Sequence, residues 1–103
     1  MGTFSSDKRE YEVDGGGFLM DPMSWDHDFA ETMSERLKIS GGLTNEHWEV
    51  LHFIRKRYKE TGICPTVYDT CRTAGLRLRE LRRLFPTGYL RGACLLAGIT
   101  YRE

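Results

Sequence analysis

Three cysteines have the side chains best suited to covalent chemistry in this chain of 103 residues. Cys64 precedes Pro65 in an expected loop, Cys71 lies on an expected helix face, and Cys94 lies near the end of a short final helix. An odd number of cysteines and no basic-then-apolar leader predict a cytoplasmic protein with reduced thiols. A cysteine thiolate can attack the sulfur of a disulfide or a persulfide. Thiol chemistry is therefore the first function to consider.

Each cysteine also has a simpler interpretation. Cys94 shares an apolar stripe with Leu90 and Ala97, so it is either a reactive thiol or a small core side chain. Cys71 is expected in the core, whereas Cys64 is expected to be exposed and oxidisable. A Cys64–Cys71 disulfide stays open, although the expected compartment argues against it. Their spacing, without a second close pair or a nearby histidine, disfavours a zinc site, and no cofactor is expected.

A cluster of arginines is the second candidate site. Residues 1–50 hold 4 Lys and Arg against 11 Asp and Glu, whereas residues 51–103 hold 11 against 4. This basic half could bind an acidic protein, or it could grip DNA phosphates through two short helices arranged like a helix-turn-helix. An overall pI of about 6.8 makes protein docking the preferred interpretation. The candidate surface residues are Arg77, Arg79, Arg82, Arg83 and Arg91.

The cluster His47, Trp48 and Glu49 suggests acid–base work at first sight, but it falls in the first turn of an expected helix. There His47 is expected to cap or pack, and Trp48 to anchor the core. No metal site, phosphate loop or nucleophile–base pair is recognisable, so a stand-alone enzyme is not expected. No apolar run approaches the roughly 20 residues that span a bilayer, so no membrane association is expected.

The expected elements form one domain over residues 11–103, after a loose lead-in over residues 1–10. Residues 11–13 and 18–20 are predicted to pair as a hairpin across a glycine-rich turn. An array of about five short helices follows, which makes the fold α+β and mostly helical. The predicted helix caps are Ser24, Thr44, Thr66 and Thr87, and the predicted stops are Gly62, Gly75, Pro86 and Gly98.

Three motifs in this order resemble the DsrC/TusE family of sulfur-relay proteins, which includes the gamma subunit of dissimilatory sulfite reductase. They are GFLMDP at residues 17–22, LTNEHWEV at residues 43–50 and LFPTGYLRGACLLAGI at residues 84–99. The resemblance covers roughly residues 11–99. It implies a persulfide-carrying protein that docks on larger partners of the sulfite reductase or sulfurtransferase type. It also matches Cys94 to the cysteine on the family's last helix.

Two features depart from the family pattern. Family members carry a second cysteine in a flexible C-terminal arm, whereas Gly98-Ile99 is followed here by Thr100-Tyr101-Arg102-Glu103. These four residues reach only about 13 Å at roughly 3.3 Å per residue. Tyr101 is predicted to fold back over Cys94, and a different tail continuing past residue 103 stays open. The connection between Pro65 and Leu84 is also several residues shorter, so partner identity cannot simply be transferred.

Two functions are consistent with these features. The first is a sulfur-relay or sulfite-reductase-associated protein that carries or senses sulfur through the single thiol of Cys94. The second is a non-catalytic regulator or adaptor of sulfur metabolism that binds a protein, or DNA, through the basic C-terminal half. Exposure of Cys94 would favour the first function, and burial would favour the second.

Overall fold

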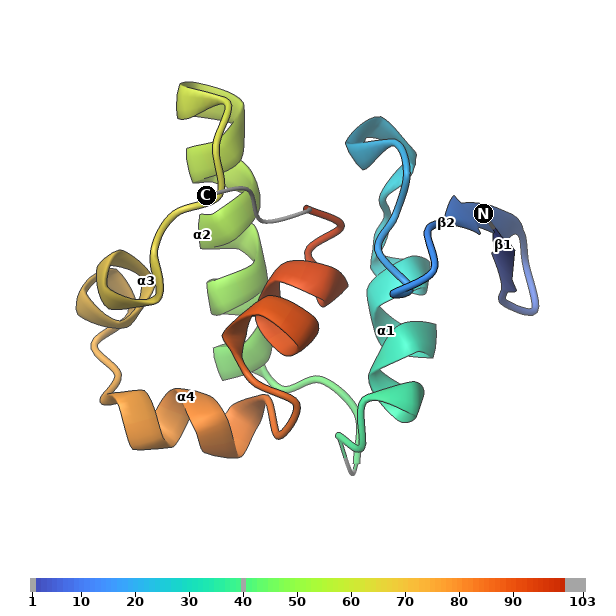
Figure 1. The fold of residues 1–103 in the computed structure, drawn as a ribbon. Helices are drawn as coiled ribbons and strands as arrows, with labels where there is room; N and C mark the ends of the chain where they lie inside the picture. The colour runs from blue at the N-terminus through green and yellow to red at the C-terminus, as the bar shows by residue number, and fades with distance from the viewer. Residues whose placement is uncertain (1, 40, 100–103) are drawn as a thin grey trace.

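The computed structural model describes residues 2–39 and 41–99. Two strands come first, followed by short helical segments (Figure 1). The prediction of an α+β, mostly helical fold with a small N-terminal hairpin is confirmed. The elements are β1 (Gly2–Ser5), β2 (Glu10–Val13), the 3₁₀ turn η1 (Pro22–Ser24), α1 (His27–Arg36), α2 (Asn45–Thr61), α3 (Val67–Ala74), α4 (Leu78–Leu84) and the π-helix η2 (Tyr89–Cys94).

The long helix α2 and the final helix η2 pack together in the middle of the molecule (Figure 1). Helices α3 and α4 lie on one side of this pair, and α1 lies on the other with the hairpin beyond it. Residues 92–99, in and just after η2, are all buried. A helix that is apolar on every face is stable only inside the core. The last helix therefore occupies the centre of the fold and is enclosed by elements from both halves of the chain.

The hairpin differs from the prediction in which segments pair. Gly2–Ser5 is a strand rather than a loose lead-in, and it pairs antiparallel with β2 in the register Gly2↔Val13 to Ser5↔Glu10. Phe4 explains the difference, because its ring is 2% exposed and packs edge-on against Phe29. The predicted partner segment at residues 18–20 contributes one isolated bridge, Val13↔Leu19. The apolar side chain at position 4 therefore allows the chain start to form a strand.

Helix α1 begins two residues later than predicted. Ser24 belongs to the turn η1, where the Asp21 side chain accepts a hydrogen bond from the Met23 amide. The N-cap of α1 is Asp26, whose side chain accepts a hydrogen bond from the Phe29 amide at 2.9 Å. The turn forms because proline is well suited to a first helical position and aspartate is a strong cap. Asp21 and Pro22 therefore place Ser24 in the turn η1, and α1 starts after it.

Helix α2 has the boundaries that the sequence predicts. Thr44 is its N-cap, and Gly62 ends it in the left-handed conformation with φ of 79°. His47 completes a capping box, because its Nδ1 accepts a hydrogen bond from the Thr44 amide at 3.0 Å. Its Nε2 lies 2.7 Å from the Leu84 carbonyl oxygen and donates to it, which joins α2 to the end of α4. The scaffold interpretation of His47 is confirmed, whereas Trp48 is only half-buried against the core.

The last three helices agree with the prediction except at the start of η2. Thr66 caps α3 and Gly75 ends it, and α4 runs to Leu84 just before Pro86. The sequence predicts Thr87 as the N-cap of the final helix, but the Thr87 hydroxyl instead donates to the Arg91 carbonyl at 2.8 Å. Gly88 occupies the N-cap position of η2. The π-winding changes the spacing of side chains around the helix. Leu90, predicted in the core stripe, is consequently 43% exposed.

Gly98 ends the final helix in the left-handed conformation, with φ of 74°. The Gly98 amide donates to Leu95 and the Ile99 amide to Cys94, the two hydrogen bonds of a Schellman motif. Two side chains bind the neighbouring carbonyls: Trp25 Nε1 donates to Leu96 at 2.7 Å and Arg55 Nη1 donates to Ala97 at 2.7 Å. The position of Gly98 and the packing of Ile99, which is 1% exposed, confirm the predicted helix end.

Candidate functional site

The side chain of Cys94 lies on the last turn of η2 and is 0% exposed. The sequence allows two interpretations of this residue, and burial agrees with the one in which Cys94 packs in the core. Its neighbours on the helix, Ala93 and Leu95, are also buried. The predicted cover from Tyr101 lies outside the described residues. Solvent thus has no direct access to the Cys94 sulfur within the part of the chain that the structure describes.

A second thiol lies beside Cys94. The Sγ atoms of Cys64 and Cys94 are 3.1 Å apart, and both cysteines are free thiols. Cys64 belongs to the short connection between α2 and α3, which starts after the left-handed Gly62 and continues through Pro65. The residue before a proline is held in an extended conformation. The connection therefore presents the Cys64 side chain to η2, 30 positions away in sequence.

The hydroxyl of Tyr89 joins this pair to α3. It donates to the Pro65 carbonyl at 2.6 Å, lies 2.8 Å from the Thr70 hydroxyl and is 3.9 Å from the sulfur of Cys64. Thr70 is 0% exposed, and its hydroxyl lies 3.0 Å from the Thr66 carbonyl oxygen. A buried hydroxyl network of this kind holds its members in place, because every broken bond leaves a desolvated polar atom. Both ends of the Cys64–Pro65 segment are thereby attached to η2.

The two thiols have opposite electrostatic properties. The hydrogen bond from Cys94 lowers the pKa of Cys64 against the effect of burial, and Tyr89 lowers it further. The same hydrogen bond, together with burial, raises the pKa of Cys94 well above its ordinary value. Burial also raises the pKa of the Tyr89 hydroxyl, so that it stays protonated. The directions of these shifts make Cys64 the more readily ionised thiol of the pair.

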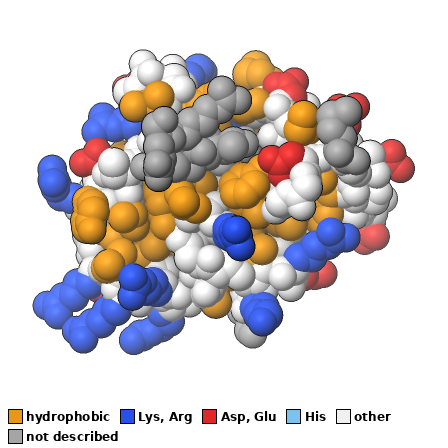
Figure 2. Space-filling model, viewed as in Figure 1, with side chains coloured by type: hydrophobic (Ala, Val, Ile, Leu, Met, Phe, Trp, Pro, Cys, Tyr) orange, Lys and Arg blue, Asp and Glu red, His pale blue; other side chains and the backbone are white. Residues whose placement is uncertain are grey.

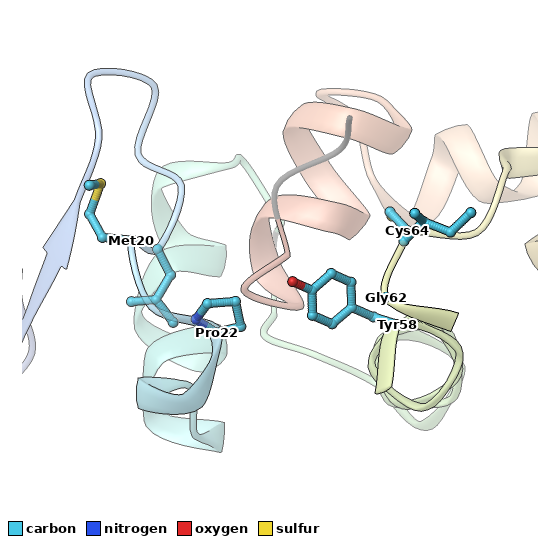
Figure 3. Close-up of a pocket in the computed structure, with 7 residues that line it drawn as sticks. Met20, Pro22, Tyr58, Gly62 and Cys64 are labelled. Atoms are coloured by element: carbon cyan, nitrogen blue, oxygen red, sulfur yellow. The ribbon is translucent and has the colours of Figure 1, made fainter. Parts of the chain in front are cut away.

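A pocket of about 200 Å³ adjoins Cys64 but not Cys94. In Figure 3 the ring of Tyr58 lies between Pro22 on one side and Cys64 on the other, and Met20 forms the far wall. The seven lining residues of this pocket come from the segment between β2 and η1, from η1, from the end of α2 and from the connection to α3. The prediction of an exposed Cys64 is wrong, because this residue is only 6% exposed; it is nevertheless one of the residues that line this pocket.

Cys71, the third thiol, does not join this site. It is 9% exposed within the core, as predicted, and burial and the nearby Glu80 carboxylate raise its pKa. The alternative of a Cys64–Cys71 disulfide is wrong, because the sulfur beside Cys64 is that of Cys94. Within residues 2–39 and 41–99, no group of three or more His, Cys, Asp or Glu side chains is placed to hold a metal ion.

Comparison with known proteins identifies the family. A family model described as "DsrC like protein" matches residues 5–101. This chain belongs to the DsrC-like family. It is 34% identical over 91 residues to the protein named "Sulfite reductase, dissimilatory-type subunit gamma" from Nitratidesulfovibrio vulgaris, with 88% of this chain and 86% of the relative covered. It is 32% identical to "Sulfurtransferase TusE" of Escherichia coli, with 88% of each chain covered.

Solved structures of the family confirm the fold of this DsrC-like chain. The crystal structure titled dissimilatory sulfite reductase I (DsrI) superposes with a TM-score of 0.93 at 28% identity, covering 99% of this chain and 97% of the other. The oxidized gamma subunit of the dissimilatory sulfite reductase (DsrC) from Archaeoglobus fulgidus gives a TM-score of 0.84 at 26% identity, with the same coverage. The resemblance found in the three motifs is thereby confirmed across the chain.

The predicted basic surface of the DsrC-like chain is exposed. The five arginines lie on α4, at its N-cap and on η2, and every one is on the surface: Arg77, Arg79, Arg82, Arg83 and Arg91. In Figure 2, Lys and Arg side chains gather on the side of the molecule where Figure 1 shows α4, beside an apolar area. Leu78 and Leu90 are among the exposed apolar residues of α4 and η2. No helix among the described residues is long and apolar enough to cross a membrane.

Sequence reasoning missed two members of the thiol cluster in this DsrC-like chain, Tyr89 and Thr70, and it missed the pairing of Cys64. Tyr89 stands inside the longest motif, but a tyrosine beside a glycine has no local pattern that reveals a partner in another segment. One weak signal was available. Cys64 precedes Pro65 and follows the helix-ending Gly62, so the backbone conformation of this connection is restricted.

Proposed function

We propose that this DsrC-like protein works in sulfur relay or in association with sulfite reductase, and that Cys94 takes part in its thiol chemistry while the protein is docked on a larger partner. The contact between the Cys94 and Cys64 sulfurs is the observation that supports the proposal most. Packing Cys94 in the core does not require a second thiol beside it. Sulfur transfer does require a thiolate close to the sulfur atom that it attacks. The resemblance of residues 84–99 to the family motif supports the same residue.

Docking is proposed through the basic surface formed by the arginines of α4 and η2. Relatives named as subunits of a larger reductase make a protein partner the natural expectation. Exposed cations next to exposed Leu78 and Leu90 resemble an interface in which a charged rim surrounds apolar contacts. The partner is expected to present an acidic surface, because complementary charge speeds encounter and fixes orientation.

A second candidate is a regulator or adaptor that binds partners without sulfur chemistry. Complete burial of Cys94 favours it, as does the raised pKa of that thiol, because a protonated, enclosed sulfur is a poor nucleophile. The same basic surface could meet either a protein or DNA. Because the names of the relatives above concern sulfite reduction and sulfur transfer, the regulator is proposed as a protein-binding one.

The test is the reaction of the folded protein with glutathione persulfide, followed by intact-mass measurement. Relay predicts that wild type reacts at its cysteines and that Cys94→Ser changes the product formed. The same reaction in denaturant controls for reagent quality, and thermal melting confirms that the variant is folded. Wild type that changes mass only when unfolded would contradict relay and leave the adaptor as the function.

A further inference from the structure

We propose that Cys64 is the thiol that receives sulfur from an incoming persulfide and that Cys94 resolves the product, so that the relay site is a pair of thiols entered from the pocket beside Cys64. The inference rests on the proposed function and assigns the order of its steps. It differs from the expectation drawn from the family motif, which gave the role of sulfur carrier to Cys94 alone.

Access separates the two cysteines. The pocket between η1 and the end of α2 is bounded by Cys64, whereas Cys94 is fully enclosed behind it. Figure 3 shows the Tyr58 ring and Pro22 among the residues that line the pocket. The volume of about 200 Å³ accommodates the end of a small thiol compound or of a partner's side chain. A sulfur donor entering there meets Cys64 first.

The geometry also suits transfer between the two thiols. Reacting atoms about 3–3.5 Å apart are in a near-attack arrangement, and the Cys64 and Cys94 sulfurs are 3.1 Å apart. Tyr89 and Pro65 hold the Cys64 segment against η2, with the hydroxyl of Tyr89 2.6 Å from the Pro65 carbonyl oxygen. The Tyr89 hydroxyl is also 3.9 Å from the Cys64 sulfur and can turn its proton towards a thiolate there.

The first step is a sulfur transfer. The Cys64 thiolate attacks the terminal sulfur of a persulfide R–S–SH, the S–S bond of that persulfide breaks, and R–S⁻ leaves and takes up a proton. The product is Cys64–S–SH. The lowered pKa of Cys64 supports this assignment, because more of that thiol is ionised near neutral pH.

The second step is resolution by Cys94. The terminal sulfur of the Cys64 persulfide takes the Cys94 proton as the Cys94 sulfur attacks the Cys64 sulfur, so Cys94 need not be ionised beforehand. The bond between the Cys64 sulfur and the terminal sulfur then breaks, and the terminal sulfur leaves as hydrogen sulfide. The two cysteine sulfurs are oxidised to a disulfide while the transferred sulfur is reduced to sulfide, so atoms and electrons balance. A dithiol reductant then restores both thiols.

The experiment compares wild type with three serine variants, each treated as a folded protein with glutathione persulfide. Samples are quenched by alkylation and measured by intact mass and peptide mapping. Wild type is expected to lose two hydrogens as a Cys64–Cys94 disulfide and to release sulfide. Cys94→Ser should accumulate one extra sulfur on Cys64. Cys64→Ser should react at least about tenfold more slowly, because its remaining site thiol is enclosed and protonated.

Cys71→Ser is the matched control, because Cys71 is buried like the other two but lies outside the pair. It should behave as wild type. If Cys64→Ser reacts at Cys94 as fast as wild type does, the order of steps is wrong while the relay function stands. If wild type itself fails to react when folded, the relay function fails. Peptide mapping of wild type at the earliest time point gives a readout that depends on no variant: the first modified residue must be Cys64.

Discussion

At the scale of single residues, the unusual feature is a pair of adjacent thiols whose pKa values shift in opposite directions. Cys94 is the residue that the family motif identifies, yet it is the enclosed, protonated member. Cys64 is the member that ionises and borders the pocket. A donor thiol that stabilises a neighbouring thiolate is a known way to lower a cysteine pKa. The proposed thiol chemistry therefore depends on both residues of the pair.

The pH dependence of alkylation tests that pair. The rate of Cys64 modification by iodoacetamide should rise with pH at a midpoint below the ordinary thiol value of 9.0, because the pKa of Cys64 is lowered chiefly by Cys94. Replacing the donor in Cys94→Ala should move the midpoint upward. The measurement is the pH–rate profile of Cys64 by peptide mapping, with Tyr58→Phe as a control on the pocket wall. An identical profile in Cys94→Ala would contradict the hydrogen bond.

At the scale of elements, Asp26 joins the hairpin to α1. Its carboxylate caps the helix and also accepts hydrogen bonds from the Tyr11 hydroxyl at 2.6 Å and from Arg9 at 2.8 Å. Burial acts against the charged form, but the hydrogen bonds from Tyr11, the Phe29 amide and Arg9 lower the pKa of Asp26 below its ordinary value of 3.8. A lowered folded-state pKa contributes stability above that ordinary value, and the contribution is lost as the pH falls further.

Asp26→Asn should lower the free energy of unfolding at pH 7 by about 1 kcal/mol, since asparagine still caps a helix but loses the charge that strengthens the other hydrogen bonds. The difference from wild type should shrink as the pH falls below 3.8, where the wild-type carboxylate becomes protonated. Urea unfolding at several pH values measures both quantities. A difference that grows in acid would show that the charge was unfavourable in the folded state.

The end of the final helix provides a second test at this scale. Gly98 has φ of 74°, and a Cβ there would lie 2.6 Å from Cδ1 of Trp25. Gly98→Ala should therefore destabilise the protein by roughly 2 kcal/mol, the sum of an unfavourable left-handed conformation and a displaced ring. Gly75→Ala, with φ of 71° but open space around it, isolates the conformational part. Thermal melts of both variants should separate them. Equal losses would exclude the Trp25 contact as a cause.

Local signals explain which elements were predictable from the sequence. Helices α2 and α3 were placed correctly because their ends are set by adjacent residues: Thr44 and Thr66 cap the starts, and Gly62 and Gly75 end the helices. The errors arose where distant contacts decide. Residues 2–5 form a strand because Phe4 is buried against another element, and Thr87 binds the Arg91 carbonyl in a π-turn instead of capping a regular helix.

The candidate site was predictable only in part for the same reason. A motif of consecutive residues identified Cys94, but the contact with Cys64 spans 30 positions and leaves no periodicity in the sequence. Tyr89 and Thr70 meet across two helices, and neither residue type indicates a partner on its own. Burial of Cys94 follows from the enclosed position of η2, and the apolar stripe in the sequence left it as one of two interpretations.

At the scale of the whole molecule, charge is divided between the two halves of the chain. Within the described residues the one ion pair, Arg9–Asp26, joins two members of the acidic half, so the arginines of the basic half are not used in internal ion pairs there. This distribution leaves the basic surface available to a partner.

Binding to purified dissimilatory sulfite reductase should therefore weaken as salt is raised, because exposed charges are screened at higher ionic strength. Replacing Arg79, Arg82 and Arg83 with alanine should weaken it about tenfold or more at low salt, and Cys94→Ser should leave it unchanged. The matched control removes three cations from the acidic half: Lys8, Arg36 and Lys38. Biolayer interferometry measures all forms. Equal loss in the control would attribute binding to net charge alone.

The closeness of two sulfurs so far apart in sequence also links redox state to chain entropy. A bond between Cys64 and Cys94 would close a loop containing α3 and α4, and the closed loop has far fewer unfolded conformations. For a loop of about 30 residues this amounts to roughly 4 kcal/mol in favour of the folded state. The oxidised protein should melt at a higher temperature than the reduced one, and α3 and α4 should become more resistant to proteolysis. Each turnover would then make the segment of α3 and α4 temporarily more resistant to unfolding, a change that a partner could sense without touching either sulfur.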